Sequence, residues 1–146
     1  MRHLKKGRKL NRTSSHRKAL FSNLASSLVI NKRIITTHPK AKELQKFIER
    51  LVTYAKYEGD KALHGRRLIQ KRIVGTLSKN IANELIHKIA PQYTSRNGGY
   101  TRVIKLQNRK NDDAVQALIE FVNLKDSLNE NDSEDNKKNK QKEDTK

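Results

Sequence analysis

Hydrophobic residues recur at helical spacing in four parts of the chain. Leucines stand at every fourth position from 20 to 28, which predicts an amphipathic helix over residues 16–30. The strongest helical pattern covers residues 39–55 and begins with a proline, which suits the first turn of a helix. Two shorter helices are predicted over residues 60–72 and 77–89, and the proline at position 91 is expected to stop the second.

Three short segments have the composition of β-strands. Residues 33–37 and 100–106 are rich in Ile, Val and Thr, which favour extended backbone. Residues 114–124 are ambiguous, because their apolar residues alternate as in a strand while their Ala, Leu and Glu content also suits a helix. We favour a strand that forms a hairpin with residues 100–106 across a turn at residues 108–113, which makes the fold α+β.

The two ends of the chain differ from its middle. Residues 1–13 carry many cations and few apolar side chains, so we expect a basic extended arm that orders on meeting RNA or DNA. Residues 125–146 are almost entirely Asn, Asp, Glu, Lys and Ser, which predicts a disordered charged tail. With 146 residues and 34% hydrophobic content, the chain has room for one domain, over residues 14–124.

Positive charge dominates the sequence and is concentrated before the tail. The chain has 33 Lys and Arg against 15 Asp and Glu, a net charge of +18, and twelve cations precede the first acidic residue, Glu43. Like charges at this density repel one another and destabilise the compact state. The sequence therefore predicts a polyanionic partner, and the phosphate backbone of a nucleic acid is the commonest one.

Other classes of protein lack support in the sequence. There is no Cys, no apolar run long enough to cross a membrane and no secretory signal. The five histidines are scattered, without the four-residue spacing that places two metal ligands on one helix face. Walker, dinucleotide-binding and nucleophile-elbow motifs are also missing. We therefore expect neither an enzyme nor a metal, a cofactor or a small-molecule substrate.

The first candidate contact with RNA is the arm together with the start of the first helix. A flexible basic segment can enter crevices of a folded RNA, where arginine pairs with phosphate and stacks on bases. A solvated tail or a localisation signal is the alternative. The candidate residues are Arg2, Lys5, Lys6, Arg8, Lys9, Arg12, His16, Arg17 and Lys18.

The second candidate contact is the segment 95–102. Its two adjacent glycines permit left-handed backbone and a close approach to phosphate, two arginines flank them, and its tyrosine can stack on a base or pack in the core. An ordinary turn that leads into a strand is the alternative. The candidate residues are Arg96, Gly98, Gly99, Tyr100 and Arg102.

A third basic cluster lies in the predicted helix over residues 60–72. Arg66, Arg67, Lys71 and Arg72 face largely outward, while Leu63, Leu68 and Ile69 are expected to face the core. A solvated helix face is the alternative. Arg67 and Lys40 are the additional candidates for RNA contact.

Three sequence blocks together resemble a known family. They are MRHLKKGRKLNRTSSHR at residues 1–17, ITTHPKAKEL at 35–44 and SRNGGYTR at 95–102. Over residues 1–124 the chain resembles the bacterial large-subunit ribosomal protein numbered seventeen. The resemblance implies a two-layer α/β domain in the order helix, strand, three helices and two strands, and it favours a strand at residues 114–124.

The resemblance also implies a function. It describes a structural protein of cytoplasmic ribosomes that binds large-subunit ribosomal RNA near the nascent-chain exit, beside neighbouring large-subunit proteins. The Arg- and Ser-rich N-terminus could pass for an organellar transit peptide, but the family begins at the same Met-Arg-His, which argues against that. A DNA-binding architectural protein is the main alternative, and an RNA-processing enzyme would need a catalytic site that the sequence does not offer.

Overall fold

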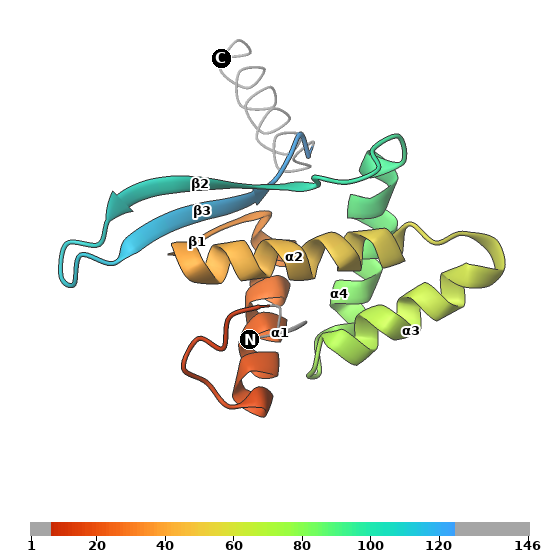
Figure 1. The fold of residues 1–146 in the computed structure, drawn as a ribbon. Helices are drawn as coiled ribbons and strands as arrows, with labels where there is room; N and C mark the ends of the chain where they lie inside the picture. Colours follow the sequence, from red (N-terminus) through yellow and green to blue (C-terminus); the bar gives the residue numbers. More distant parts are fainter. Residues whose placement is uncertain (1–6, 125–146) are drawn as a thin grey trace, which may run out of the picture.

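The computed structural model describes residues 7–124 and has the α+β order that the sequence predicts (Figure 1). The main elements are α1 (Ser14–Asn31), β1 (Arg33–Thr37), α2 (His38–Ala55), α3 (Ala62–Arg72), α4 (Ser78–Glu84), β2 (Thr101–Asn108) and β3 (Val115–Phe121). The predicted tail and the first six residues of the arm lie outside the described residues.

The helical chain after α3 is longer than the sequence predicts. After α4 it continues as a π-helical segment, Leu85–Ile89, and then as a 3₁₀ turn, Ala90–Tyr93. The α- and π-helical part ends at Ile89, as predicted, and Pro91 lies in the first turn of the 3₁₀ helix that follows. At that position a missing backbone N–H removes no hydrogen bond, so a proline is tolerated. A further 3₁₀ turn, Gly59–Lys61, leads into α3.

The three strands form one antiparallel sheet in the order β1-β3-β2. β2 and β3 make the predicted hairpin, in which Thr101 faces Phe121. β1 pairs with the opposite edge of β3 and places Arg33 across from Glu120. The strand over residues 115–121 is therefore confirmed, and it is the central strand although it comes last in the chain.

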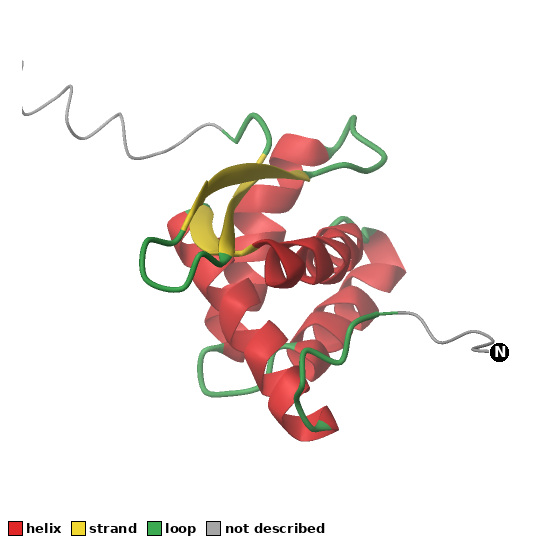
Figure 2. Ribbon diagram, turned by 60° about the vertical axis from the view of Figure 1, so that its left-hand side comes forward, coloured by secondary structure: helices red, strands yellow, loops and turns green. Residues whose placement is uncertain are grey.

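The sheet forms one layer and the helices form the other (Figures 1 and 2). The inward face of β3 carries Ala117 and Ile119, which are fully buried. They belong to the same core cluster as Leu44 and Ile48 of α2, the helix that runs beneath the sheet. Burial of these apolar side chains between the layers is the main favourable contribution to folding.

The buried face of α1 combines two small residues, Ser22 and Ala25, with Leu28 and Val29. Of the regularly spaced leucines, only Leu28 is fully buried, whereas Leu20 and Leu24 are partly exposed. Ser22 is also buried, and its hydroxyl donates to the Val74 carbonyl at 3.1 Å and accepts from the Val74 N–H at 2.8 Å. This pair of hydrogen bonds joins α1 to the chain just after α3.

α3 packs on α2 through a glycine. Leu63 was expected to face the core but is 58% exposed, whereas Ile69 is fully buried as predicted. Gly65 is buried, and a Cβ atom added there would overlap the Tyr54 carbonyl oxygen and lie 3.2 Å from the Tyr57 ring. The missing side chain therefore allows the two helices to approach closely.

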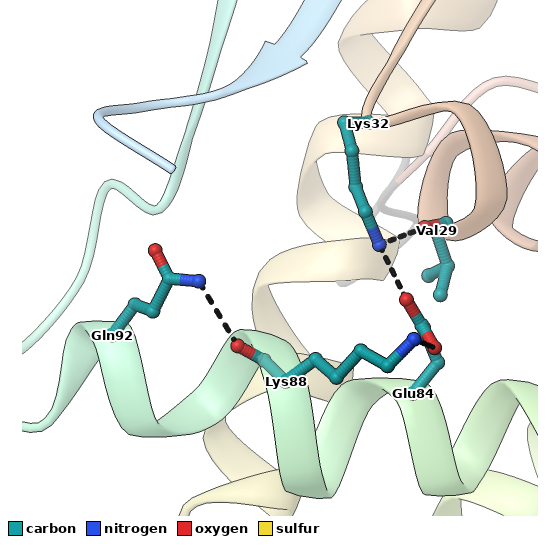
Figure 3. A network of polar contacts seen from close by, with 5 residues as sticks. All are labelled: Val29, Lys32, Glu84, Lys88 and Gln92. Carbon is teal, nitrogen blue, oxygen red and sulfur yellow. Dashed lines mark hydrogen bonds and ion pairs between the residues drawn. The ribbon is translucent and has the colours of Figure 1, made fainter. Parts of the chain in front are cut away.

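A network of ion pairs joins the end of α1 to α4 (Figure 3). Lys32 Nζ lies 2.8 Å from Glu84 Oε1 and 2.8 Å from the Val29 carbonyl oxygen, and Lys88 Nζ lies 3.0 Å from Glu84 Oε2. Partial burial raises the pKa of Glu84, but the hydrogen bonds and charges of the two lysines outweigh this effect. The pKa of Glu84 is therefore held below its ordinary value of 4.5.

We expect Glu84→Gln to lower the free energy of unfolding by about 1 kcal/mol near neutral pH, since the pair is only partly shielded from solvent. A carboxylate whose pKa is lowered on folding stabilises the protein only while it is ionised. The difference in free energy of unfolding between wild type and variant should thus have its full value above the pKa of Glu84 in the unfolded chain, near 4.5. It should disappear as the pH falls through the pKa of Glu84 in the folded protein. Urea denaturation at a series of pH values measures this, and a constant difference throughout would contradict it.

Candidate nucleic-acid interface

The arm turns before α1 begins. The Arg12 N–H donates to the Lys9 carbonyl at 3.2 Å, and Leu10 and Asn11 have positive φ angles of 54° and 50°. The described part of the arm is thus folded into a turn, which differs from the extended chain that the sequence predicts. The turn sets Arg12 directly before the first residues of the helix.

Basic side chains of this turn and of the start of α1 lie against one another. Nη1 of Arg12 is 3.1 Å from Nδ1 of His16, and Nη1 of Arg17 donates to the Arg12 carbonyl at 3.2 Å. The first turn of α1 has no acidic residue, so these cations stand at the positive end of the helix dipole. A bound anion would relieve the repulsion, because helix N-termini favour negative charge.

α1 and α3 bring together cations that are far apart in the sequence. They line one groove, whose other walls include the apolar side chains of Phe21 and Phe47. The two rings are stacked, with their centroids 6.0 Å apart and their planes at 23°. The charged residues of this α1–α3 groove are Arg17, Lys18, Lys71 and Arg72.

Only part of the third basic cluster contributes to the groove. Lys71 and Arg72 line it, and Nη2 of Arg72 also donates to the Tyr54 hydroxyl at 3.4 Å. Arg67 is exposed on α3 and lies outside the lining, and Arg66 is bonded to Asn83 instead. Arg67 was selected from the sequence because residue spacing shows which charges point outward. The position of α3 relative to α1 depends on tertiary packing, which spacing does not show.

Glu49 of α2 holds the Gly-Gly loop in place. Its carboxylate accepts from the N–H of Tyr100 at 3.2 Å, and from the N–H and hydroxyl of Thr101 at 2.9 and 2.8 Å. Glu43 on the same helix forms an ion pair with Lys46 at 3.2 Å, whereas Glu49 is bonded to the loop. The reason is that α2 passes under the start of β2, where these loop donors need an acceptor.

Tyr100 packs in the core and does not face solvent. It is 2% exposed, and its ring centroid lies 5.3 Å from that of Tyr93. Lys56 Nζ lies 5.4 Å from the Tyr100 ring centroid and donates to the Arg96 carbonyl at 2.7 Å. Burial raises the pKa of Tyr93 to about 12, and its hydroxyl donates to the Val122 carbonyl at 2.7 Å. Of the two roles considered for Tyr100, packing is the one that this arrangement supports.

The outer part of the loop presents glycine backbone between two arginines. Gly98 and Gly99 are exposed, and a Cβ atom added at either would meet nothing within 4 Å. Gly99 has a φ of 65°, in the left-handed region that favours glycine. Nε of Arg96 donates to the Gly98 carbonyl at 3.2 Å, and Arg102 is paired with Glu120 on β3. Both arginines are therefore positioned by the fold itself.

The two candidate contacts lie at opposite ends of the domain. In both views the start of α1 lies at the bottom and the loop before β2 lies at the top (Figures 1 and 2). Lys40, half-buried in the first turn of α2, is not among the residues that line the groove. The structure therefore does not gather the candidate residues into one pocket, and only an extended ligand could touch both ends.

We expect Glu49→Gln to lower the free energy of unfolding by roughly 2 kcal/mol, because hydrogen bonds to a charged acceptor are worth about 1.5–3 kcal/mol and a neutral amide cannot serve all three donors. Chemical denaturation measures the loss. Glu43→Gln is the matched control, since its ion pair with the exposed Lys46 should contribute less than about 1 kcal/mol. Equal losses in the two variants would contradict the role given to Glu49.

The described residues were also compared with what a metal site or a membrane span requires. Within residues 7–124, no three His, Asp or Glu side chains lie close enough to hold a metal ion. No helix in that range is long and apolar enough to cross a membrane. Every buried side-chain nitrogen and oxygen atom described has a hydrogen-bond partner.

Comparison with known proteins agrees with the resemblance seen in the sequence. Residues 20–122 match the family described as ribosomal protein L17. The chain is 51% identical over 122 residues to the large ribosomal subunit protein bL17 of Allorhizobium ampelinum, covering 84% of this chain and 82% of that protein. It is 48% identical, with the same coverage, to the bL17 protein of Agrobacterium fabrum. The predicted resemblance is thereby confirmed, and the chain belongs to the ribosomal protein L17 family.

Proposed function

We propose that this protein is a structural, non-enzymatic component of the large ribosomal subunit that binds and stabilises large-subunit ribosomal RNA during assembly. Its membership of the L17 family, whose two relatives above are named as large-subunit proteins, supports the subunit assignment. The observation that carries RNA binding is the cluster of cations on the arm, α1 and α3. Within residues 7–124, none of these side chains has an acidic partner.

The mechanism is neutralisation of phosphate charge with release of counterions, combined with insertion of a shaped basic arm into folded RNA. The arm and the start of α1 supply the first contact, to which the candidates Arg2, Lys5 and Lys6 outside the described residues also belong. Gly98 and Gly99, with Arg96 and Arg102, supply the second, and the buried Tyr100 positions that loop. Lys40 on α2 and Arg67 on α3 add further positive charge to the surface.

A comparison of the affinities for ribosomal RNA and for DNA distinguishes this function from DNA binding, its main alternative. Purified full-length protein is titrated with large-subunit ribosomal RNA and with duplex DNA at equal phosphate concentration and moderate salt. We expect tighter binding to the ribosomal RNA. Both nucleic acids attract the protein's positive charge, but only the folded RNA also matches the shape of the arm and the loop. Equal affinity for duplex DNA would instead favour a DNA-binding architectural protein.

We further propose that the uncovered face of the sheet packs against a neighbouring large-subunit protein. Ile35, Leu118 and Ile104 form one row across the three strands, since Leu118 pairs with both isoleucines. Ile35 is 61% exposed and Ile104 is 40% exposed. In the adjacent row, Glu120 offsets the charge of Arg102, which leaves Arg33 as the one arginine of that row without an ion pair in the described part of the chain. An aliphatic surface with so little unpaired charge suits a protein partner better than phosphate.

A photo-reactive amino acid at position 35 tests this face in assembled particles. A cross-link to another large-subunit protein would support the proposal, and cross-links to ribosomal RNA alone would contradict it. The identity of the protein that is cross-linked would also test the expected location near the nascent-chain exit.

A further inference from the structure

The α1–α3 groove has an aromatic wall that the binding of phosphate does not require. Phosphate contacts need only cations or backbone N–H groups. Here the stacked rings of Phe21 and Phe47, which are only partly buried, line the groove together with Leu68. An apolar surface left open to solvent in a protein this polar calls for an apolar or aromatic occupant.

The phenylalanine pair is also reached from a second side. A cavity of about 500 Å³ adjoins the groove and shares Phe21, Phe47 and Arg72 with it. Gly7 of the arm lines this cavity, so the arm borders the aromatic pair. The carboxylate in the cavity, Glu43, is neutralised by its ion pair with Lys46. Both spaces that the two rings line are therefore bounded by net positive charge.

Two lysines face the groove without any ion pair in the described part of the chain. Lys18 comes from α1 and Lys71 from α3, and both are exposed. Because α1 and α3 both pack on α2, these like charges come to the same groove, which opposes folding unless an anion lies between them. The groove thus combines an aromatic surface with charges that suit a phosphate.

We propose that the α1–α3 groove binds one nucleotide of ribosomal RNA that has left its helical stack, with the base against the Phe21–Phe47 pair and the phosphate toward Lys18 and Lys71. This inference rests on the proposed RNA-binding function and names the RNA element that this part of the surface takes. RNA-binding proteins commonly stack splayed bases on aromatic rings while cations hold the backbone. A hydrophobic peptide in the same place would leave the groove's cations without partners.

The test compares an unstacked base with a paired one. Full-length protein is titrated with a single-stranded oligoribonucleotide that carries one 2-aminopurine, and with a duplex of the same length. Wild-type protein should quench the fluorescence of the single strand as the base stacks. Phe21→Leu keeps an apolar side chain but removes the aromatic face, so single-strand binding should weaken by roughly 5- to 100-fold. Duplex binding, which depends on backbone charge, should change by less than about twofold.

A pair of lysine substitutions provides a second variant that alters no buried side chain. Lys18→Gln with Lys71→Gln should lose more single-strand affinity than Lys79→Gln with Lys105→Gln. The control pair removes the same charge from exposed residues outside the groove. Equal losses in the two pairs would overturn the proposal. This comparison stands even if circular dichroism shows that Phe21→Leu does not fold.

The outcomes separate the groove from the broader function. If folded Phe21→Leu binds the single strand as wild type does, or loses single-strand and duplex affinity equally, the groove does not hold a base. Wild-type protein that fails to bind ribosomal RNA at all would instead contradict RNA binding itself. Wild-type binding to ribosomal RNA with unaffected groove variants would overturn only the nucleotide site, and it would point to a peptide or to the chain's own arm as the occupant.

Discussion

Gly65→Ala should destabilise the domain by roughly 3 kcal/mol, because the new methyl group would overlap the Tyr54 carbonyl of the neighbouring helix. The usual effect of replacing a helical glycine by alanine is the opposite, a gain in stability. In the interior of an unencumbered helix, alanine is favoured over glycine by about 1 kcal/mol. Here the atom in the way belongs to backbone, so α3 would have to move away from α2. That shift would also disturb the groove that α3 forms with α1.

Chemical denaturation of Gly65→Ala measures the loss, and Gly98→Ala is the matched control. Gly98 is exposed, has no positive φ angle and has open space around an added Cβ atom. Its substitution should therefore leave the free energy of unfolding within about 0.5 kcal/mol of the wild-type value. A stable Gly65→Ala protein would show that the α2–α3 packing described above is wrong.

Arg8→Ala with Arg12→Ala should weaken binding to large-subunit ribosomal RNA by roughly 10- to 100-fold and lower the occupancy of the protein in assembled subunits. With each arginine removed from a phosphate contact, binding releases fewer counterions from the RNA. The slope of log affinity against log salt concentration should therefore become shallower by about 2. Filter binding over a range of salt concentrations measures both quantities.

Two exposed lysines away from the arm provide the control for this variant. Lys61→Ala with Lys79→Ala removes the same charge from the 3₁₀ turn before α3 and from the first turn of α4. If this control weakens binding as much as the arginine pair does, only total charge matters and the arm is no anchor. Unchanged subunit occupancy of the Arg8 and Arg12 variant would contradict the arm's role as well.

Most of the fold could be predicted because it follows from local pattern. The apolar periodicity over residues 39–55 and the β-branched run at 33–37 place α2 and β1 within a residue or two of the observed bounds. The position of β1 in the sheet could not be predicted in this way. Its pairing with β3 depends on a contact between distant parts of the chain, and no turn joins the two strands directly.

The candidate site was predictable in its charge but not in its assembly. The basic arm and the Gly-Gly motif are visible as composition, and the structure exposes most of residues 7–13 of the arm and both glycines. The hydrogen bonds between Glu49 and the loop arise from helix packing, and so does the presence of Lys18 and Lys71 in one groove. Gly65 was missed for a related reason. The pattern of apolar residues does not show where a glycine allows two helices to pack closely.

Sedimentation of a native lysate through a sucrose gradient, with Mg²⁺ and moderate salt, tests most directly whether this protein is a component of the large subunit. The protein is quantified in every fraction by mass spectrometry. We predict that it is present at the same stoichiometry as other large-subunit proteins in the large-subunit and intact-ribosome fractions, and that it remains there after a high-salt wash. Recovery only with the nucleoid or in the free fractions at the top of the gradient would contradict this.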